Sequence, residues 1–393
     1  MNIQGFSFSA VEAAIKKPGR KDLALIFSDV PAIAAAVFTT STVKAAPVLV
    51  SREHIASGFA QALIVNSGNA NACTGEPGMK VAQETSSLVA HGLGIDAADV
   101  QVCSTGVIGV QMPMDRIRAA VPQLVDGLSS GTLADVAQAI MTTDTFPKME
   151  TGCGEAGGIS YTVAGIAKGA GMIMPNMATM LSFIVSDASV EPVFLQNTFR
   201  KAVERSFNAI TVDGDMSTND TCLIMANGMA GNPEITEGSS EGNSFAAILN
   251  NILLSLAKQI VKDGEGATKF VEIRVGGAKD DSDAKLAAMA IANSSLVKTA
   301  FFGQDANWGR IFAAIGYSGA EVDQSRLFLR FDDVCMARNG IFAGEDAEAR
   351  GSEVLKQKEF TVSVDLGIGN GAATVYTSDL THEYVSINAD YRS

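Results

Sequence analysis

One short stretch combines the residue types that nucleophilic chemistry needs. Residues 168–187 read KGAGMIMPNMATMLSFIVSD, in which a glycine-rich loop with one lysine leads through Pro175 and Asn176 to Thr179. An apolar run typical of a core strand begins at this threonine. Glycine, proline and asparagine allow a sharp turn and a close approach of the backbone to another group. The spacing alone also fits an ordinary threonine at the entry of a strand.

The chemistry open to such a threonine is covalent catalysis by a nucleophile that the chain itself uncovers. The Thr179 hydroxyl would attack the carbonyl of Ala178, an N-to-O acyl shift would form an ester, and hydrolysis would free a new α-amino group. That amine would serve as the general base for the same hydroxyl, because a hydroxyl is a weak nucleophile without an adjacent base. An α-amino pKa of about 7.7–8.0 leaves a useful neutral fraction near pH 7. This solution suits a chain with three histidines.

Three other motif-like stretches fit structural explanations better. Residues 127–131, GLSSG, follow a predicted helix, whereas a nucleophile elbow needs a strand before it. Residues 367–371, GIGNG, precede a predicted strand, which favours a hairpin turn over a dinucleotide loop. The methionines between 172 and 180 have no cysteine or histidine beside them and are expected to fill the core. We therefore expect no metal site.

The composition argues against several classes of protein. The chain has 393 residues, of which 47% are hydrophobic and 18% charged, with a net charge of −14. It can bury a sizeable core, and its acidic balance without clustered Lys or Arg argues against binding to nucleic acid. We find no signal-peptide pattern and expect no membrane partner. Five scattered cysteines without a C-x-x-C pair favour a reduced, cytoplasmic protein.

The elements that must position Thr179 alternate between strands and helices with glycine-rich joints. Mixed order with several hairpins predicts an α/β (α+β) fold rather than a purely parallel sheet. The character changes near residue 280, which predicts a catalytic core over 1–280 and a smaller domain over 281–393. The patterns predict helices at 77–94, 193–207, 244–264, 283–293 and 307–316, and strands at 181–190 and 296–302.

Six further stretches accompany the threonine segment in a fixed order: VNSGNANACTG, CSTGVIG, AIMTTDTFPK, DGEGATK, DANWGRI and HEYVSINADYRS. With these motifs the chain resembles, over nearly its whole length, the ornithine acetyltransferases, also called glutamate N-acetyltransferases, of arginine biosynthesis. The resemblance implies a layered αββα-type sandwich core with a smaller mixed C-terminal domain. It also implies cleavage between Ala178 and Thr179 into an α chain of residues 1–178 and a β chain of residues 179–393. These chains would stay together, in a heterotetramer of two α and two β chains.

The resemblance also implies roles for individual residues. Thr179 would be the nucleophile that carries the acetyl group, and Thr105 and Gly106 in CSTGVIG would form the oxyanion hole. Lys168 would hold the α-carboxylate of the substrate and Glu265 an ammonium group. Which of the two threonines in MTTDT contacts substrate stays open. The implied substrate-binding residues are Thr142, Thr143, Lys168, Thr179, Glu265, Asn388 and Ser393.

The expected reaction is a ping-pong acetyl transfer. N-acetylornithine acylates Thr179, ornithine leaves, and glutamate attacks the acetyl ester to give N-acetylglutamate. No metal or organic cofactor is expected, and the use of acetyl-CoA as a second donor is left open. An amidase or aminopeptidase that gives the acyl group to water is the alternative, and a non-enzymatic binding protein with an uncut chain is the third hypothesis. Lys168 and Glu265 together suit a zwitterionic amino acid, which favours transfer.

Overall fold

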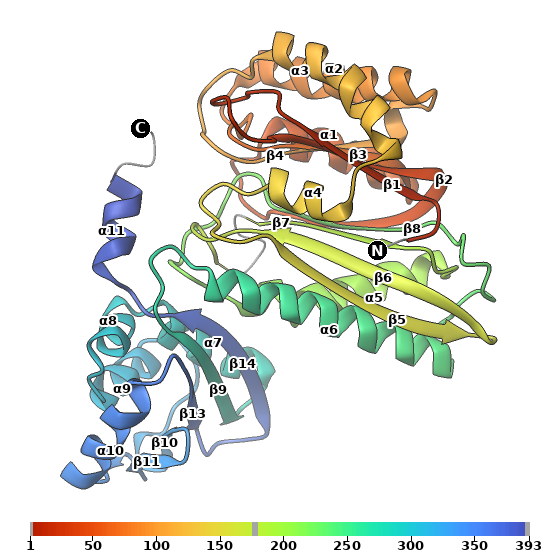
Figure 1. The fold of residues 1–393 in the computed structure, drawn as a ribbon. Helices are drawn as coiled ribbons and strands as arrows, with labels where there is room; N and C mark the ends of the chain where they lie inside the picture. Colours follow the sequence, from red (N-terminus) through yellow and green to blue (C-terminus); the bar gives the residue numbers. More distant parts are fainter. Residues whose placement is uncertain (1–2, 175–179, 390–393) are drawn as a thin grey trace. The chain divides into compact units, whose positions relative to one another are not determined.

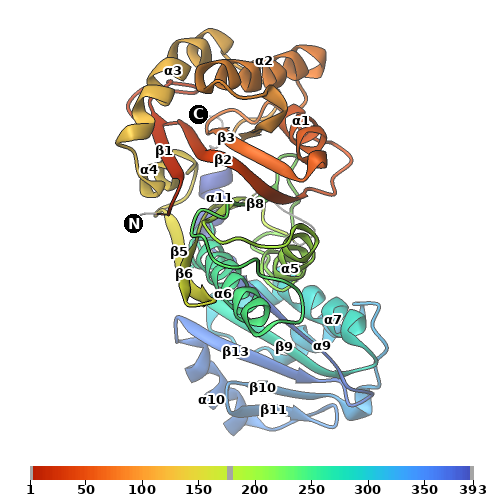
Figure 2. The same cartoon turned by 90° about the vertical axis from the view of Figure 1, so that its right-hand side faces the viewer.

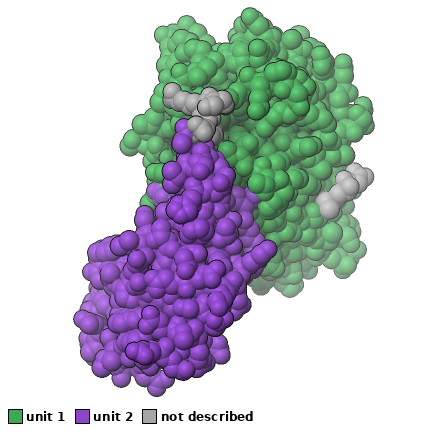
Figure 3. All heavy atoms as spheres, turned by 60° about the vertical axis from the view of Figure 1, so that its left-hand side comes forward, with its two compact units in different colours: residues 1–208, 215–260 green, residues 209–214, 261–393 purple. Residues whose placement is uncertain are grey.

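The computed structural model describes residues 3–174 and 180–389 and divides the chain into two compact units. Unit 1 consists of residues 1–208 and 215–260, and unit 2 of residues 209–214 and 261–393, as coloured in Figure 3. This division falls earlier in the chain than the boundary predicted near residue 280. The reason is that β9 (Phe270–Ala278) is an inner strand of the sheet of unit 2.

Unit 1 is built on an eight-stranded sheet whose long strand β2 (Leu23–Phe38) belongs to two layers. The strand order is β4-β3-β2-β8-β7-β6-β5, and β1 also pairs with β2. The first part of β2 pairs with β3, and after a register shift between Phe27 and Ala32 its last part pairs with β8. The other strands of unit 1 are β1 (Phe6–Val11), β3 (Phe59–Asn66), β4 (Val100–Ser104), β5 (Lys148–Ala156), β6 (Ile159–Lys168), β7 (Leu181–Ser186) and β8 (Thr221–Ala226).

The two layers pack face to face, and helices cover their outer faces (Figures 1 and 2). Side chains of β1–β3 and of β6–β8 share one core with the short helix α4 (Leu133–Ala139). On the far side of β2–β4 lie α1 (Ala46–His54), α2 (Gly75–Leu93) and α3 (Met114–Asp126), and α5 (Pro192–Glu204) and α6 (Ser240–Lys262) cover the far side of β5–β8. The predicted α/β class with an αββα-type core is confirmed.

Helix α6 is long and apolar enough, by length and composition, to cross a membrane. In this fold, however, its apolar face packs on the sheet. Leu249, Leu253 and Leu256 are fully buried, and a Cβ added at Gly165 of β6 would lie 3.0 Å from Leu256 Cδ1. The apolar character of α6 is therefore explained by its place as a core helix of unit 1.

Unit 2 is a smaller mixed domain, as predicted. Its sheet has the order β12-β11-β10-β13-β9-β14, in which β9 and β13 run parallel. Apolar side chains of α7, α8 and α9 pack on this sheet. Its other elements are α7 (Asp281–Asn293), α8 (Ser295–Gly303), α9 (Trp308–Gly316), α10 (Glu345–Leu355), α11 (His382–Ala389), β10 (Phe328–Phe331), β11 (Val334–Arg338), β12 (Ile341–Phe342), β13 (Glu359–Asp365) and β14 (Gly371–Ser378).

The strand predicted at 296–302 is wrong, because these residues form α8. Ser294 caps this helix by accepting a hydrogen bond from the Val297 N–H. Val297 and Phe301, one helical turn apart, are both buried in the core of unit 2. The apolar spacing and the cap together outweigh the β-branched and aromatic composition that suggested a strand.

Candidate active site

The predicted oxyanion-hole residues lie in the turn that follows β4. The Thr105 N–H donates to the Asn66 carbonyl at 3.0 Å, and Thr105 forms an isolated bridge with Asn69. Gly106 has a φ of 135°, and a Cβ there would lie 2.3 Å from the backbone of Gly68. A glycine is therefore required at 106. The close approach of Gly106 to Gly68 therefore brings the motifs VNSGNANACTG and CSTGVIG together.

Lys168, the last residue of β6, lies against this turn. It is 2% exposed, and its Nζ donates to Thr105 Oγ1 at 3.3 Å. An ammonium group has only donors, so the Thr105 hydroxyl must accept this bond. Its own hydrogen is then directed to a different acceptor. The structure thus brings together two residues that the resemblance assigned to the same site.

Asp144 supports this cluster from the loop before β5. Its Oδ1 accepts from Lys148 Nζ and from the Gly169 N–H, both at 2.7 Å, and its Oδ2 accepts from the Thr142 N–H at 2.9 Å. Burial raises the pKa of this carboxyl, but the charges of Lys168 and Lys148 and these hydrogen bonds outweigh burial and lower the pKa to about 2. Asp144 is an ionised counterion for two buried lysines. Sequence reasoning missed it, although it stands in the MTTDT motif.

The two threonines of that motif have different surroundings. Thr142 lines an open pocket of about 320 Å³ together with Gly19, Arg20, Lys21, Gln138, Met141 and Asp144. Thr143 is half-buried and lies outside that lining. Of the two threonines, Thr142 is therefore the one at the wall of this pocket.

A second carboxyl, Asp220, contacts the residue that leads into β7, the strand that follows the predicted nucleophile. It directly precedes β8, is fully buried, and accepts a hydrogen bond from the Met180 N–H at Oδ1, at 2.8 Å. Burial raises its pKa well above the usual range, and the Met180 bond and the charge of Lys168 offset this only in part. Sequence reasoning did not single out Asp220.

The predicted cleavage pair, Ala178 and Thr179, and the predicted contact Ser393 lie outside the described residues. The strand that follows the cleavage pair, β7, pairs with β6 and β8 from Leu181 on. Lys168 is opposite Leu181 in the antiparallel β6–β7 ladder. This register places the lysine, and with it Thr105, at the end of β7 where the chain enters from Thr179.

The other predicted binding residues meet within unit 2. Asn388 of α11 donates from Nδ2 to Glu265 Oε2 at 2.8 Å and to the Tyr384 carbonyl at 3.0 Å. Glu265 is 9% exposed, and the Tyr384 hydroxyl donates to Asp213 Oδ2 at 3.2 Å. Two residues that are far apart in the sequence therefore form one polar contact.

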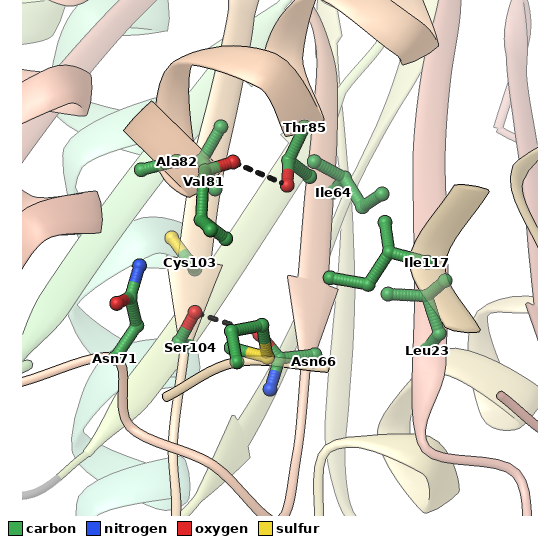
Figure 4. A pocket seen from close by; sticks show the side chains of 12 residues that line it. Leu23, Ile64, Asn66, Asn71, Val81, Ala82, Thr85, Cys103, Ser104 and Ile117 are labelled. Atoms are coloured by element: carbon green, nitrogen blue, oxygen red, sulfur yellow. Dashed lines mark hydrogen bonds between the residues drawn. The ribbon is translucent and has the colours of Figure 1, made fainter. Parts of the chain in front are cut away.

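A small cavity between α2, α3 and the sheet carries no chemistry of its own (Figure 4). Its volume is about 10 Å³, roughly the space of one water molecule. Its polar groups have protein partners: Ser104 donates to Asn66 Oδ1 at 2.7 Å, and Thr85 to the Val81 carbonyl at 2.8 Å. Burial raises the pKa of the Cys103 thiol to about 12, so this cysteine is not a thiolate nucleophile.

Comparison with known proteins decides the family. The sequence model of the ArgJ family matches residues 7–393. The chain belongs to the ArgJ family. It is 68% identical over 393 residues to the arginine biosynthesis bifunctional protein ArgJ of Geobacter sulfurreducens, with 100% of both chains covered. It is 56% identical over 394 residues to the protein of the same name from Syntrophotalea carbinolica, again with 100% of both chains covered.

A solved ArgJ-family structure supports the fold of part of the chain. The crystal structure of arginine biosynthesis bifunctional protein ArgJ from Bacillus halodurans is 42% identical, with a TM-score of 0.52. The match covers 54% of this chain and 99% of that one. The resemblance found from the motifs is confirmed, and it places the chain in a family of arginine biosynthesis.

Proposed function

We propose that this ArgJ-family chain is a glutamate N-acetyltransferase, or ornithine acetyltransferase. It transfers the acetyl group of N2-acetyl-L-ornithine to L-glutamate and yields L-ornithine and N-acetyl-L-glutamate. The observation that carries the proposal is the buried contact of Lys168 with Thr105, at the end of β7 where the chain enters from Thr179. This contact supplies a cation and an oriented hydroxyl at the end of the strand that follows the proposed nucleophile in the chain.

The first reaction is self-cleavage. The Thr179 oxygen bonds to the Ala178 carbonyl carbon as the C–N bond breaks, and the hydroxyl proton passes to the Thr179 nitrogen. Water then hydrolyses the ester, which leaves a carboxylate on Ala178 and a free amine and hydroxyl on Thr179. The amine is the general base of the mature enzyme.

Acetyl transfer then uses Thr179 twice. Its hydroxyl gives a proton to the amine and attacks the acetyl carbonyl, and ornithine leaves after its nitrogen takes up that proton. The amino group of glutamate attacks the resulting ester and restores Thr179. Thr105 and Gly106 stabilise the negative oxygen of both tetrahedral intermediates, a contribution of about 2.7–4 kcal/mol for each donor.

The substrates are amino acids, and the charged residues suit them. Lys168 pairs with an α-carboxylate, and Glu265 with Asn388 accepts and orients an ammonium group. The threonine, its amine and the two oxyanion donors supply every step, so we propose no metal or organic cofactor. We further propose that the α and β chains form a cytoplasmic heterotetramer.

The decisive experiment compares the wild type with Thr179→Ala. Denaturing electrophoresis and intact mass should show fragments 1–178 and 179–393 for the wild type and one full-length chain for the variant. The variant should also release no ornithine from N-acetylornithine, because it lacks the attacking oxygen. A variant that stays active, or an intact wild type that still transfers acetyl groups, contradicts the mechanism.

A second assay separates transfer from hydrolysis. The cleaved enzyme receives N-acetylornithine with and without glutamate, and ornithine and N-acetylglutamate are measured. A transferase makes N-acetylglutamate and needs glutamate for sustained ornithine release. Equal ornithine release without glutamate, and no N-acetylglutamate with it, identifies a hydrolase. Replacing N-acetylornithine by acetyl-CoA shows whether the second donor is used.

A further inference from the structure

A carboxyl group outside the set of assigned residues contacts the strand of the nucleophile. Asp220 is 0% exposed, and its Oδ1 accepts the Met180 N–H at 2.8 Å. Its Oδ2 has no hydrogen-bond partner among the residues that the structure describes. Buried polar atoms normally have partners, so a fully buried carboxyl oxygen without one requires an explanation.

The contact fixes the residue that follows Thr179 in the chain. Met180 is held on both sides, because its N–H donates to Asp220 and its carbonyl accepts from the Thr221 N–H at 3.2 Å. The parallel pairing of β7 with β8 begins directly after it, at Leu181 and Thr221. Asp220 therefore completes the ladder at the position next to the nucleophile.

Two carboxyl groups that feel the charge of Lys168 have pKa values shifted in opposite directions. Asp144 receives the charges of Lys168 and Lys148, which keep it ionised. Asp220 accepts a hydrogen bond from Met180 and feels the Lys168 charge, but burial dominates and raises its pKa well above the usual range. Burial therefore favours the uncharged form of Asp220, and the geometry requires of it only that Oδ1 accept the Met180 N–H.

We propose that Asp220 is a positioning residue for Thr179, which acts by holding the Met180 amide in place for both self-cleavage and acetyl transfer. The inference rests on the proposed function of Thr179 as nucleophile. What the site requires at 220 is a hydrogen-bond acceptor of the right length, and a negative charge is not needed. A displacement of a reacting group by about 1 Å from the productive geometry can slow a positioned reaction by about 10²-fold.

The test uses three substitutions at Asp220. Asp220→Asn keeps a carbonyl acceptor and cannot ionise, Asp220→Ala removes the acceptor, and Asp220→Leu removes it while filling the space. We expect Asp220→Ala or Asp220→Leu to slow both self-cleavage and kcat by at least about tenfold, the effect of one lost hydrogen bond. Asp220→Asn should stay within about threefold of the wild type, with an unchanged pH profile of kcat. The leucine variant serves if the alanine variant does not fold.

Asp187 provides a matched control at the opposite end of the same strand. It directly follows β7, is 6% exposed, and accepts backbone hydrogen bonds from Gln4 at 3.1 Å and Thr162 at 2.6 Å. Asp187→Ala should lower the melting temperature as Asp220→Ala does, but leave the rate of self-cleavage unchanged. Loss of cleavage in both alanine variants would reduce the role of Asp220 to general stability and overturn the proposal.

Two other results overturn it. One is an Asp220→Ala enzyme that cleaves and turns over like the wild type. The other is an Asp220→Asn enzyme as impaired as the alanine variant, since a charge or a transferable proton would then be required. If Thr179→Ala is inactive while Asp220→Ala is normal, this inference alone fails. If Thr179→Ala is active, the proposed function fails first.

Discussion

At the scale of single residues, the hydroxyl of Thr105 is oriented by a neighbour that can only donate. Lys168 Nζ occupies an acceptor position of Thr105 Oγ1 at 3.3 Å, and both side chains are buried. The hydroxyl hydrogen must then point to a third group. In the proposed reaction that group is the oxyanion, so no reorientation is needed as charge develops.

Thr105→Val tests this orientation at constant shape. We expect kcat to fall by about 10²–10³-fold, the usual effect of losing one oxyanion donor. Self-cleavage should slow as well, because it passes through the same type of intermediate. The matched control is Thr105→Ser, which keeps the hydroxyl and should retain most of the activity. Steady-state rates that are equal for valine and wild type would remove Thr105 from the oxyanion hole.

The sequence motifs pointed to residues that the fold does bring together. Thr105 and Lys168 meet in unit 1, and Glu265 and Asn388 meet in unit 2. Asp144 and Asp220 were missed. The charge of Lys168 acts on the pKa of both carboxyls, and Asp220 also accepts a backbone N–H 40 residues away. These contacts exist only after folding.

At the scale of elements, α8 is anchored to β14 by a buried lysine. Lys298 is 3% exposed and donates to Thr377 Oγ1 at 3.0 Å and to the carbonyl of Ser378. Burial lowers its pKa to about 7, although the charges of Asp379 and Asp213 act in the opposite direction. The folded unit therefore loses this proton far more easily than the unfolded chain does.

The stability of unit 2 should consequently depend on pH. Between about pH 7 and the ordinary lysine pKa near 10.4, the unfolded state binds more protons, so the free energy of unfolding rises with pH, by at most about 1.4 kcal/mol per pH unit. Below pH 7 both states hold the proton and this contribution is constant. Urea unfolding followed by the fluorescence of Trp308, the single tryptophan, reports on unit 2.

Lys298→Met should flatten this rise while lowering stability overall, because the acceptors on Thr377 and Ser378 lose their donor. Lys356, which is exposed and pairs with Glu353 at 2.6 Å, provides the control. Lys356→Met should leave the pH dependence intact. A slope that survives in Lys298→Met would show that another group is responsible.

The type of an element was predictable where the apolar periodicity was long, as in α6. The prediction was wrong where a short apolar run fitted both a strand and a helix. Residues 296–302 contain the composition of a strand, but the cap at Ser294 and the buried pair Val297 and Phe301 make a helix. The strand predicted at 181–190 is shorter, because β7 ends at Ser186 and Asp187 turns back to bind other backbone groups.

At the scale of the whole molecule, the proposed cleavage divides a sheet whose strands interleave. Strands β2 and β6 come from residues before 178, and β7 and β8 from residues after 179. In the sheet, β7 and β8 lie between β6 and β2. Neither fragment can leave unit 1 without breaking the β2–β8 and β6–β7 ladders.

We therefore expect the two fragments to co-elute in native size-exclusion chromatography and to separate in denaturant. Each fragment produced alone should be insoluble, because it exposes strand edges and a core face that the other fragment covers. Co-expression should restore a soluble complex. Two separate peaks in native buffer would contradict the interleaved arrangement.

The layered core followed from the resemblance, whereas the division into units could not be predicted from composition. Residues 209–214 belong to unit 2 because Ile210 bridges to Tyr376, far along the chain. Only pairing between distant segments defines that boundary. The charged stretch near residue 280, which suggested it, is the start of α7.

The pairing of β2 with β8 also bears on when the proposed self-cleavage could take place. Residues 33–38 can meet residues 221–226 only after the ribosome has produced the chain through residue 226, and such distant contacts form slowly. Synthesis at about 5–20 residues per second leaves β2 waiting for its partner for roughly ten seconds or more. Until β8 arrives, Asp220 cannot hold Met180. If the proposed self-cleavage requires this contact, the two fragments should appear on a gel only after β2 and β8 have paired, and a condition that delays this pairing should leave an uncut precursor.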